Sequence, residues 1–212
     1  MNKIITISRE YGSGGRVIGK AVADKLGIPF YDRELIELSA QKSGLAVSFV
    51  EDTEQKIKNK FLHNLAFGGR YMGVEPAVSG LSLSDKLFIA TCDIIREIAD
   101  RGPCVIVGRC ADYILKDREN IFDVFVYADD EHKANRIAQR NDMALDKALA
   151  EVKKTDKYRA NHYDYYTERV WGEKENYHLC LNSGLLESTN ASNLSSARLR
   201  IKATTSNAGA EE

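Results

Sequence analysis

The chain is poor in the features that would assign it to a specialised class. Among its 212 residues are three prolines, one tryptophan and four cysteines, and no two of the cysteines form a C-x-x-C pair. A disulfide framework or a zinc site is therefore not expected, and all four cysteines are interpreted as free thiols. No apolar run reaches the roughly 18 residues that a membrane span requires, so no membrane segment is expected.

An excess of charge of either sign is also missing. The 30 Lys and Arg residues nearly balance the 31 Asp and Glu residues, which gives a net charge of −1 and a pI near 6.5. A nucleic-acid or membrane surface is therefore not expected. A strand-like run begins almost at Met1, so no cleaved signal peptide is expected and the cytoplasm is the expected compartment. No pattern in the sequence indicates an oligomeric state.

The most informative stretch lies near the amino terminus. The β-branched run Ile4 to Ile7 predicts a buried strand, and the helix-compatible segment 17–26 follows a cluster of glycines. A strand, a glycine turn and a helix start, in that order, place unpaired backbone N–H groups around an anion site. Glycine also lets the backbone approach a phosphate closely. The sequence therefore predicts a phosphate-binding loop, and the alternative is an ordinary strand-to-helix turn.

This loop departs from the standard phosphate-loop motif. The motif G-x-x-x-x-G-K-[ST] needs a lysine and a hydroxyl, but Gly15 occupies the lysine position, Arg16 the next, and no Ser or Thr follows. Arg16 could supply positive charge, although its planar fork is not equivalent to an ammonium group. The residues predicted to bind the donor phosphates are Arg9, Gly12, Ser13, Gly14, Gly15, Arg16 and Val17.

The rest of the chain alternates strand-like and helix-like patterns. Further strands are predicted at 30–31, 104–107, 124–127 and 177–181, and helices at 34–41, 83–99, 132–140 and 144–169. A turn is expected at Ser183 and Gly184. Such alternation predicts an α/β fold with a parallel sheet flanked by helices and with ligands at the carboxyl ends of the strands. We expect one domain over residues 1–203 and a flexible tail over 204–212.

A dinucleotide-binding Rossmann site is an alternative reading of the same glycines. Asp32 ends the second predicted strand, where a carboxylate could bind a ribose hydroxyl. However, Val17 replaces the third glycine of that fingerprint, which normally allows close packing of helix and strand. Four arginines also give more positive charge than a pyrophosphate needs: Arg9, Arg16, Arg33 and Arg109.

Two further features suggest cations for phosphate. Arg109 follows Gly108 at the tip of a predicted strand, where it could clamp a phosphate of an acceptor nucleotide or of ATP; the alternative is an ion pair with Asp112 or Asp129. In the later helix, helical spacing would place Arg159 beside tyrosines 163 and 166. Cationic lids of this kind close on transferring phosphates, and the alternative is a solvated charged helix with an aromatic packing stripe.

Several stretches together resemble the cytidylate kinase-like family. The matching residues are 5–16 (ITISREYGSGGR), 26–32 (LGIPFYD), 102–109 (GPCVIVGR) and 177–183 (YHLCLNS). The resemblance implies a P-loop nucleoside-monophosphate-kinase fold, with an acceptor-binding insertion at 43–84 and a helical lid at about 142–171. It also implies ATP and Mg²⁺ as cofactors, and transfer of the γ-phosphoryl group to a small-molecule nucleotide, such as a pyrimidine monophosphate.

The resemblance also implies roles for particular residues. Catalytic cations would be Arg16, Arg109, Arg159 and Arg169, and the acceptor would be bound by Asp32, Arg33, Arg109 and Asp112. True cytidylate kinases carry a loop lysine and an Asp-Gly-Arg strand tip, whereas this chain has Gly15 and Val107-Gly108-Arg109. A hydroxyl residue near the metal is replaced by Val17. Either Arg16 and the lid arginines compensate for the missing lysine, or a second hypothesis holds, in which the chain is a catalytically weak nucleotide-binding or regulatory protein. A purely structural interaction domain is a third.

Overall fold

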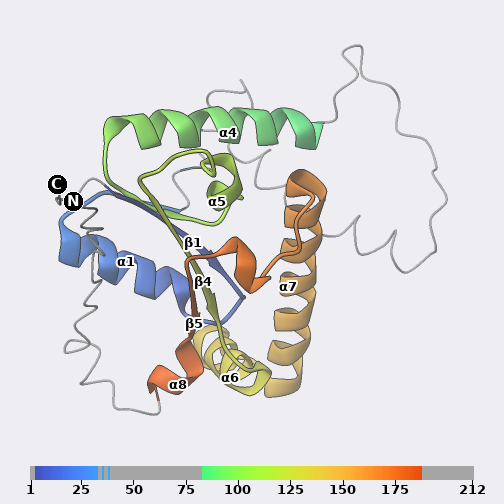
Figure 1. Ribbon diagram of the computed structural model, residues 1–212. Coiled ribbons are helices and arrows are strands. Elements are labelled where there is room, and N and C mark those ends of the chain that lie inside the picture. Colours follow the sequence, from blue (N-terminus) through green and yellow to red (C-terminus); the bar gives the residue numbers. More distant parts are fainter. Residues whose placement is uncertain (1–2, 33–34, 36–37, 39–82, 188–212) are drawn as a thin grey trace, which may run out of the picture.

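The computed structural model describes residues 3–32, 35, 38 and 83–187, which form a sheet with helices on both faces (Figure 1). Every strand pairing in the sheet is parallel, and the spatial order is β2-β3-β1-β4-β5. The strands are β1 (Ile4–Arg9), β2 (Phe30–Tyr31), β3 (Val105–Val107), β4 (Ile121–Tyr127) and β5 (Leu179–Asn182). The predicted α/β fold with a parallel sheet is confirmed.

This strand order argues against the Rossmann alternative. In a Rossmann sheet the second strand lies next to the first, but here β3 lies between β1 and β2. The strand β2 that ends at Asp32 is thus not the direct neighbour of β1.

The helices follow the predicted alternation, with small changes at their ends. They are α1 (Gly15–Leu26), α4 (Leu83–Arg101), α5 (Ala111–Ile114), α6 (Asp130–Asn141), α7 (Leu145–Thr167), the 3-10 turn η1 (Lys174–Asn176) and α8 (Ser183–Glu187). Helix α6 begins two residues before the predicted start at 132, because the Asp129 side chain accepts a hydrogen bond from the His132 amide and caps the helix there. The prediction of a turn at Gly184 is wrong. Its amide donates to the Asn182 side chain, and the short α8 begins there instead.

Alternate side chains of the strands build a core on each face of the sheet. On one face, Ile7 and Val107 pack with Ala23 of α1. On the other, Ile4 and Ile106 pack with α4 and α5. Figure 1 shows α1 and α4 on opposite sides of the strands. The strand β1, which leads into the glycine loop, is therefore packed on both faces.

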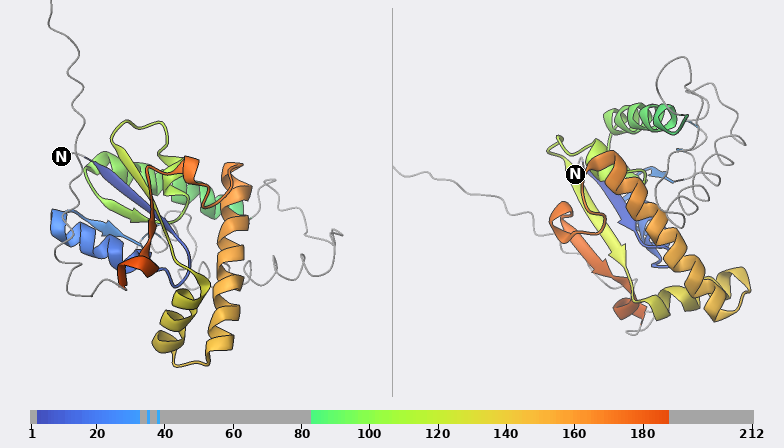
Figure 2. Two further views of the ribbon diagram at one scale, coloured as in Figure 1. Left: turned by 60° about the horizontal axis from the view of Figure 1, so that its bottom comes forward. Right: turned by 90° about the vertical axis from the view of Figure 1, so that its right-hand side faces the viewer.

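Helix α7 connects distant parts of the molecule. Its amino-terminal half packs on α6 through Val152 and Ala148 against Ile137. Near its carboxyl end, the Tyr166 ring stacks on Phe88 of α4, with ring centroids 3.9 Å apart. Figures 1 and 2 show the helix running beside the carboxyl ends of the strands. The predicted helix at 144–169 is confirmed, although it ends at Thr167.

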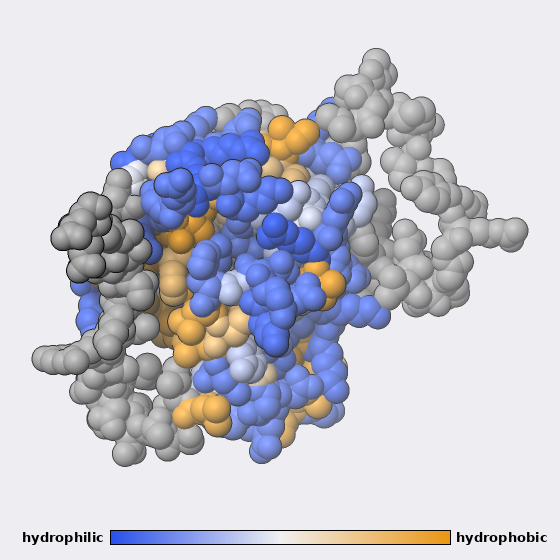
Figure 3. Space-filling model, viewed as in Figure 1, coloured by the Kyte–Doolittle hydropathy of each residue, from blue (hydrophilic) through white to orange (hydrophobic). Residues whose placement is uncertain are grey.

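The described helices include none that is long and apolar enough to cross a membrane. The face drawn in Figure 3 is mostly hydrophilic, with small groups of apolar residues between the charged ones. The predicted helix at 34–41 lies almost outside the described residues, where only positions 35 and 38 are seen to be helical. The expected insertion at 43–84 is likewise outside them except for its last two residues, and the expected tail at 204–212 lies wholly outside.

Candidate phosphate-binding site

The glycine loop takes a conformation that needs glycine at two positions. Gly12 and Gly14 have φ values of 85° and 79°, in the left-handed region that other residues rarely adopt. A Cβ on Gly12 would lie 2.7 Å from the backbone oxygen of Lys133 in α6. The loop therefore passes directly against the backbone of α6, and a larger residue would push the two apart.

Side chains from α6 and α8 hold the carbonyl groups of the loop. Arg136 donates to the Gly12 oxygen at 2.9 Å, and the Ser183 hydroxyl donates to the Ser13 oxygen at 2.5 Å. Because a trans peptide points its C=O and N–H in opposite directions, the Gly14 N–H points away from Ser183. These contacts therefore turn the amides at the start of α1 toward the side where an anion could bind.

Not all of the predicted amide donors are open. The Tyr11 amide donates to Asp156 at 2.6 Å, and the Ser13 amide donates to the Glu10 oxygen at 3.3 Å. The Ser13 hydroxyl donates to that same oxygen. Among the described residues, by contrast, none accepts a hydrogen bond from the amides of Gly14, Gly15 or Arg16. The open part of the loop is thus the first turn of α1, where the helix dipole also favours an anion.

Arginine side chains gather beside these amides. The Arg16 Nε lies 2.6 Å from one oxygen of Asp32, and the Arg9 Nη2 lies 3.8 Å from the other. Arg159 reaches in from α7 and donates to the Arg9 carbonyl at 2.9 Å. Burial, together with repulsion from Arg159, Arg109 and Arg16, lowers the pKa of Arg9 to about 9. The site therefore holds crowded positive charge that a bound anion would stabilise.

The tip of β3 is shaped to fit this arginine cluster. Gly108, Arg109 and Cys110 all have positive φ values, of 74°, 60° and 56°. Such strain in residues other than glycine is common at functional sites. A Cβ on Gly108 would lie only 2.0 Å from the Arg9 Nη1. The Arg9 guanidinium thus lies across Gly108, and Arg109 is close enough to affect its charge.

Two of the predicted site residues lie elsewhere. Arg169 follows the end of α7 and lies over the Tyr113 ring, 5.3 Å from its centroid. The Asp112 carboxylate is buried and accepts hydrogen bonds from Ser8 and Tyr163, and burial raises its pKa. Val17 lies in the first turn of α1, with 73% of its surface exposed. The structure therefore brings together Arg9, Arg16, Arg109, Arg159 and Asp32 but not Arg169 and Asp112; Arg33 lies outside the described residues.

Tyr163 and Tyr166 of α7 do not lie at the glycine loop beside Arg159. Tyr163 donates to the buried Asp112 at 2.6 Å, and Tyr166 donates to Asp85 of α4 at 3.2 Å. These contacts anchor the helix to α5 and α4. Arg159 lies one turn earlier, above the Tyr11 ring. The expectation of a lid at 142–171 stays a prediction.

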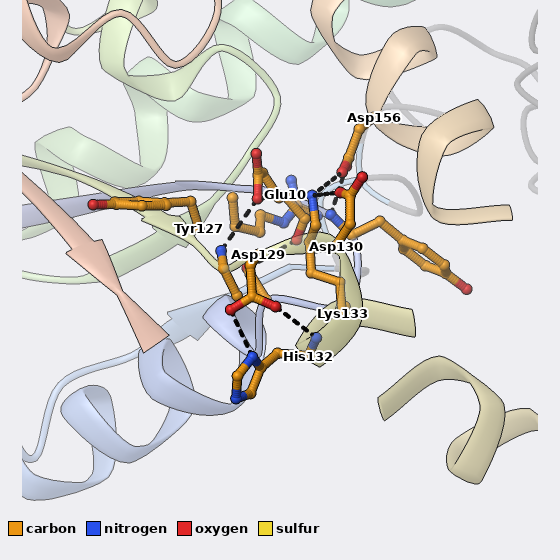
Figure 4. Close-up of polar contacts among 12 residues, drawn as sticks. Glu10, Tyr127, Asp129, Asp130, His132, Lys133 and Asp156 are labelled. Carbon is orange, nitrogen blue, oxygen red and sulfur yellow. Dashed lines mark hydrogen bonds and ion pairs between the residues drawn. The ribbon is translucent and has the colours of Figure 1, made fainter. Parts of the chain in front are cut away.

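The sequence analysis missed a cluster of charges under the loop, drawn in Figure 4. The Lys133 ammonium is 6% exposed and lies 3.0 Å from Glu10, 3.1 Å from Asp130 and 3.3 Å from Asp156. Burial alone would lower the pKa of Lys133, but the hydrogen bond to Glu10 and the charges of the carboxylates raise it. Lys133 and Arg136 stand three residues apart on α6, directly after β4. That position at a strand end is the signal that could have revealed them.

No group of three or more His, Cys, Asp or Glu side chains in the described part of the chain could hold a metal ion. The Val17 side chain has no oxygen to offer at the expected hydroxyl position, and both oxygens of Asp32 face arginines. The expectation of Mg²⁺ as a cofactor stays a prediction.

A parallel sheet whose first strand leads through a glycine loop into a helix start with open amides is the arrangement of the P-loop kinase class of fold. The chain belongs to the cytidylate kinase-like family, whose family model matches residues 4–185. The resemblance stated from the sequence is confirmed. Family membership supports a kinase of nucleotides or other small molecules.

One solved structure supports this fold, and a second match is too distant to carry an argument. An uncharacterized protein from Eubacterium ventriosum is 26% identical, with a TM-score of 0.60, and the match covers 88% of this chain and 94% of that one. Shikimate kinase from Bacteroides thetaiotaomicron is 14% identical, with a TM-score of 0.47 and coverage of 86% and 87%. At that distance the second match says nothing about the activity of this chain. No curated protein matches the sequence.

Proposed function

We propose that this chain is an ATP-dependent kinase that transfers the γ-phosphoryl group to a small acceptor, most simply a pyrimidine nucleoside monophosphate. The observation that carries the proposal is the meeting of open helix-start amides with Arg9, Arg16 and Arg159. Phosphoryl transfer requires little covalent chemistry from the protein, and positioning with charge neutralisation supplies the rate. This site offers both.

The division of labour follows from the strand order. The donor phosphates would bind the amides of Gly14 and Gly15, beyond the end of β1. The acceptor would approach Asp32 and Arg109, at the tips of β2 and β3, which both lie on the same side of β1. Arg159 comes from α7 and would stabilise the charge between the two substrates. The nucleotide would bring Mg²⁺ with it, and the base-binding part of the acceptor site would lie in the 43–84 segment.

A steady-state assay tests the proposal. Purified protein with ATP, Mg²⁺ and separate nucleoside monophosphates is expected to form ADP and a diphosphate product, fastest with a pyrimidine nucleotide. Arg159→Gln is expected to lower kcat/KM about 100- to 1000-fold, the usual effect of removing a charge-stabilising group. Arg96→Gln, which removes a half-exposed arginine of α4, serves as the control and should stay within about twofold of the wild type.

The result that would defeat the kinase proposal is ADP formation that is independent of every acceptor, at the same rate in the wild type and in Arg159→Gln.

One observation favours a second candidate, a nucleotide-binding protein with weak catalysis: neither a loop lysine nor a hydroxyl for the metal is present at Gly15 and Val17. Calorimetry separates the two, because that candidate predicts tight ATP binding without turnover.

A further inference from the structure

The loop differs from the standard motif at two positions that form a pair. When Gly14 is aligned with the second glycine of G-x-x-x-x-G-K-[ST], Gly15 takes the place of the lysine and Arg9 takes the place of the first glycine. Relative to the motif, a glycine and a cation have changed places. The cation that the motif places after its second glycine is thus found at the position of its first glycine instead.

The structure brings these two positions into contact. A Cβ on Gly15 would lie 2.6 Å from the Cβ of Arg9 and 3.1 Å from its Cγ. The Val126 side chain closes the other side at 3.2 Å. Non-bonded carbon atoms meet at about 3.5–4.0 Å, so a side chain at position 15 and the arginine at position 9 exclude each other. Only one of the two positions can supply the cation.

Arg9 is better placed than Arg16 to serve as that cation. Arg16 is 61% exposed, and its Nε already pairs with Asp32 at 2.6 Å. The Arg9 guanidinium is more enclosed, 22% exposed, and its contact with Asp32 is longer at 3.8 Å. It lies across Gly108, between the glycine loop and the tips of β2 and β3. This is the zone where donor and acceptor phosphates would meet.

We propose that Arg9 supplies the phosphate-binding cation that the standard loop takes from its lysine, and that position 15 is glycine to leave room for it. The identity of the anion as the donor triphosphate rests on the proposed function. The planar fork of arginine can donate two parallel hydrogen bonds to one phosphate. The repulsion that Arg159 and Arg109 exert on Arg9 would be relieved by the same anion.

The exchange is tested by reversing it. The variants are Arg9→Gly, Gly15→Lys and the double variant Arg9→Gly/Gly15→Lys, with Arg96→Gln as the control. Isothermal titration with inorganic tripolyphosphate measures binding without any turnover. Arg9→Gly is expected to weaken binding at least about 10-fold, the effect of one lost charge-assisted hydrogen bond. The double variant is expected to return to within about threefold of the wild type, and Gly15→Lys alone is expected to lower Tm through its overlap with Arg9.

The proposal that Arg9 replaces the loop lysine would be overturned if the double variant did not fold. It would also be overturned if the double variant folded but bound tripolyphosphate no better than Arg9→Gly. A Gly15→Lys variant with an unchanged Tm would also contradict it, because the two side chains would then coexist. Failure of the kinase proposal remains distinguishable. In that case neither the wild type nor any variant would transfer phosphate from ATP. Tripolyphosphate would still bind more weakly to Arg9→Gly than to the wild type, and the double variant would still recover that binding.

Discussion

Lys133→Met is expected to lower the free energy of unfolding by about 3 kcal/mol, the usual cost of leaving buried carboxylates without their counter-charge. The physical reason is the set of carboxylates around this lysine. Glu10 and Asp156 lie within 3.3 Å of its ammonium, largely screened from water, and would lose their shared counter-charge. Denaturant unfolding followed by circular dichroism measures the change.

Two further variants control this experiment. Lys153→Met removes a 63% exposed lysine, 3.8 Å from the same Asp130, and is expected to change stability by less than about 0.5 kcal/mol. Adding Asp156→Asn to Lys133→Met removes one of the uncompensated charges and should recover part of the loss. A Lys133→Met protein within about 1 kcal/mol of the wild type would show that the cluster is not a significant source of stability.

The stability conferred by Lys133 should also depend on pH. Because the carboxylates raise its pKa in the folded state, the contribution is complete below the ordinary lysine pKa and is lost as pH rises through the raised value. The difference in stability between the wild type and Lys133→Met is therefore expected to narrow above about pH 10.5. The same substitution would leave negative charge next to the glycine loop, so phosphate binding should weaken as well.

Gly108→Ala is expected to lower kcat/KM of the proposed kinase reaction about 100-fold or more. The new Cβ would occupy the place of the Arg9 Nη1, which lies 2.0 Å from it. Arg9 would have to leave its position between the loop and the strand tips. The backbone strain of alanine at a φ of 74° would add a stability loss of about 1–2 kcal/mol. Steady-state kinetics and thermal unfolding measure the two effects separately.

The chain offers a matched control for the backbone strain. Gly27 has a φ of 64°, and nothing lies within 4 Å of a Cβ built there. Gly27→Ala should therefore show a similar loss of stability without loss of activity. Adding Arg9→Gly to Gly108→Ala should recover the part of the stability that the overlap costs, but not the part lost to backbone strain, and should leave the enzyme slow. Full activity in Gly108→Ala would mean that the position of Arg9 does not matter for the reaction.

The sequence was sufficient to predict the sheet and the loop because their signals are local. The β-branched run before Gly12 and the helix pattern after it identify β1, the loop and α1 without reference to the rest of the chain. The position of Arg109 at a strand tip was predictable for the same reason. Parallel strands bring their carboxyl ends to one edge, so residues at those ends meet whatever their separation along the chain.

Other parts of the site depend on contacts that no local pattern reveals. Arg136 and Ser183 donate to the loop carbonyls of Gly12 and Ser13 from positions 124 and 170 residues further along the chain. The sequence around Gly12 does not indicate which distant residues make these contacts. Arg169 was predicted to act with Arg159 as a cation of a helical lid. The helix ends first, because Glu168 takes a left-handed conformation with a φ of 55°. That break turns the chain away from the loop and places Arg169 over Tyr113.

The most direct test of the account is an amide NMR titration of ¹⁵N-labelled protein with a non-hydrolysable ATP analogue. The open amides of Gly14, Gly15 and Arg16 are expected to show the largest shift changes, because phosphate oxygens would accept their hydrogen bonds. The amides of Gly27 and Gly102 should stay nearly unchanged. The account would be contradicted if the analogue bound saturably and shifted the resonances of other amides, while the amide resonances of Gly14 and Gly15 stayed unchanged.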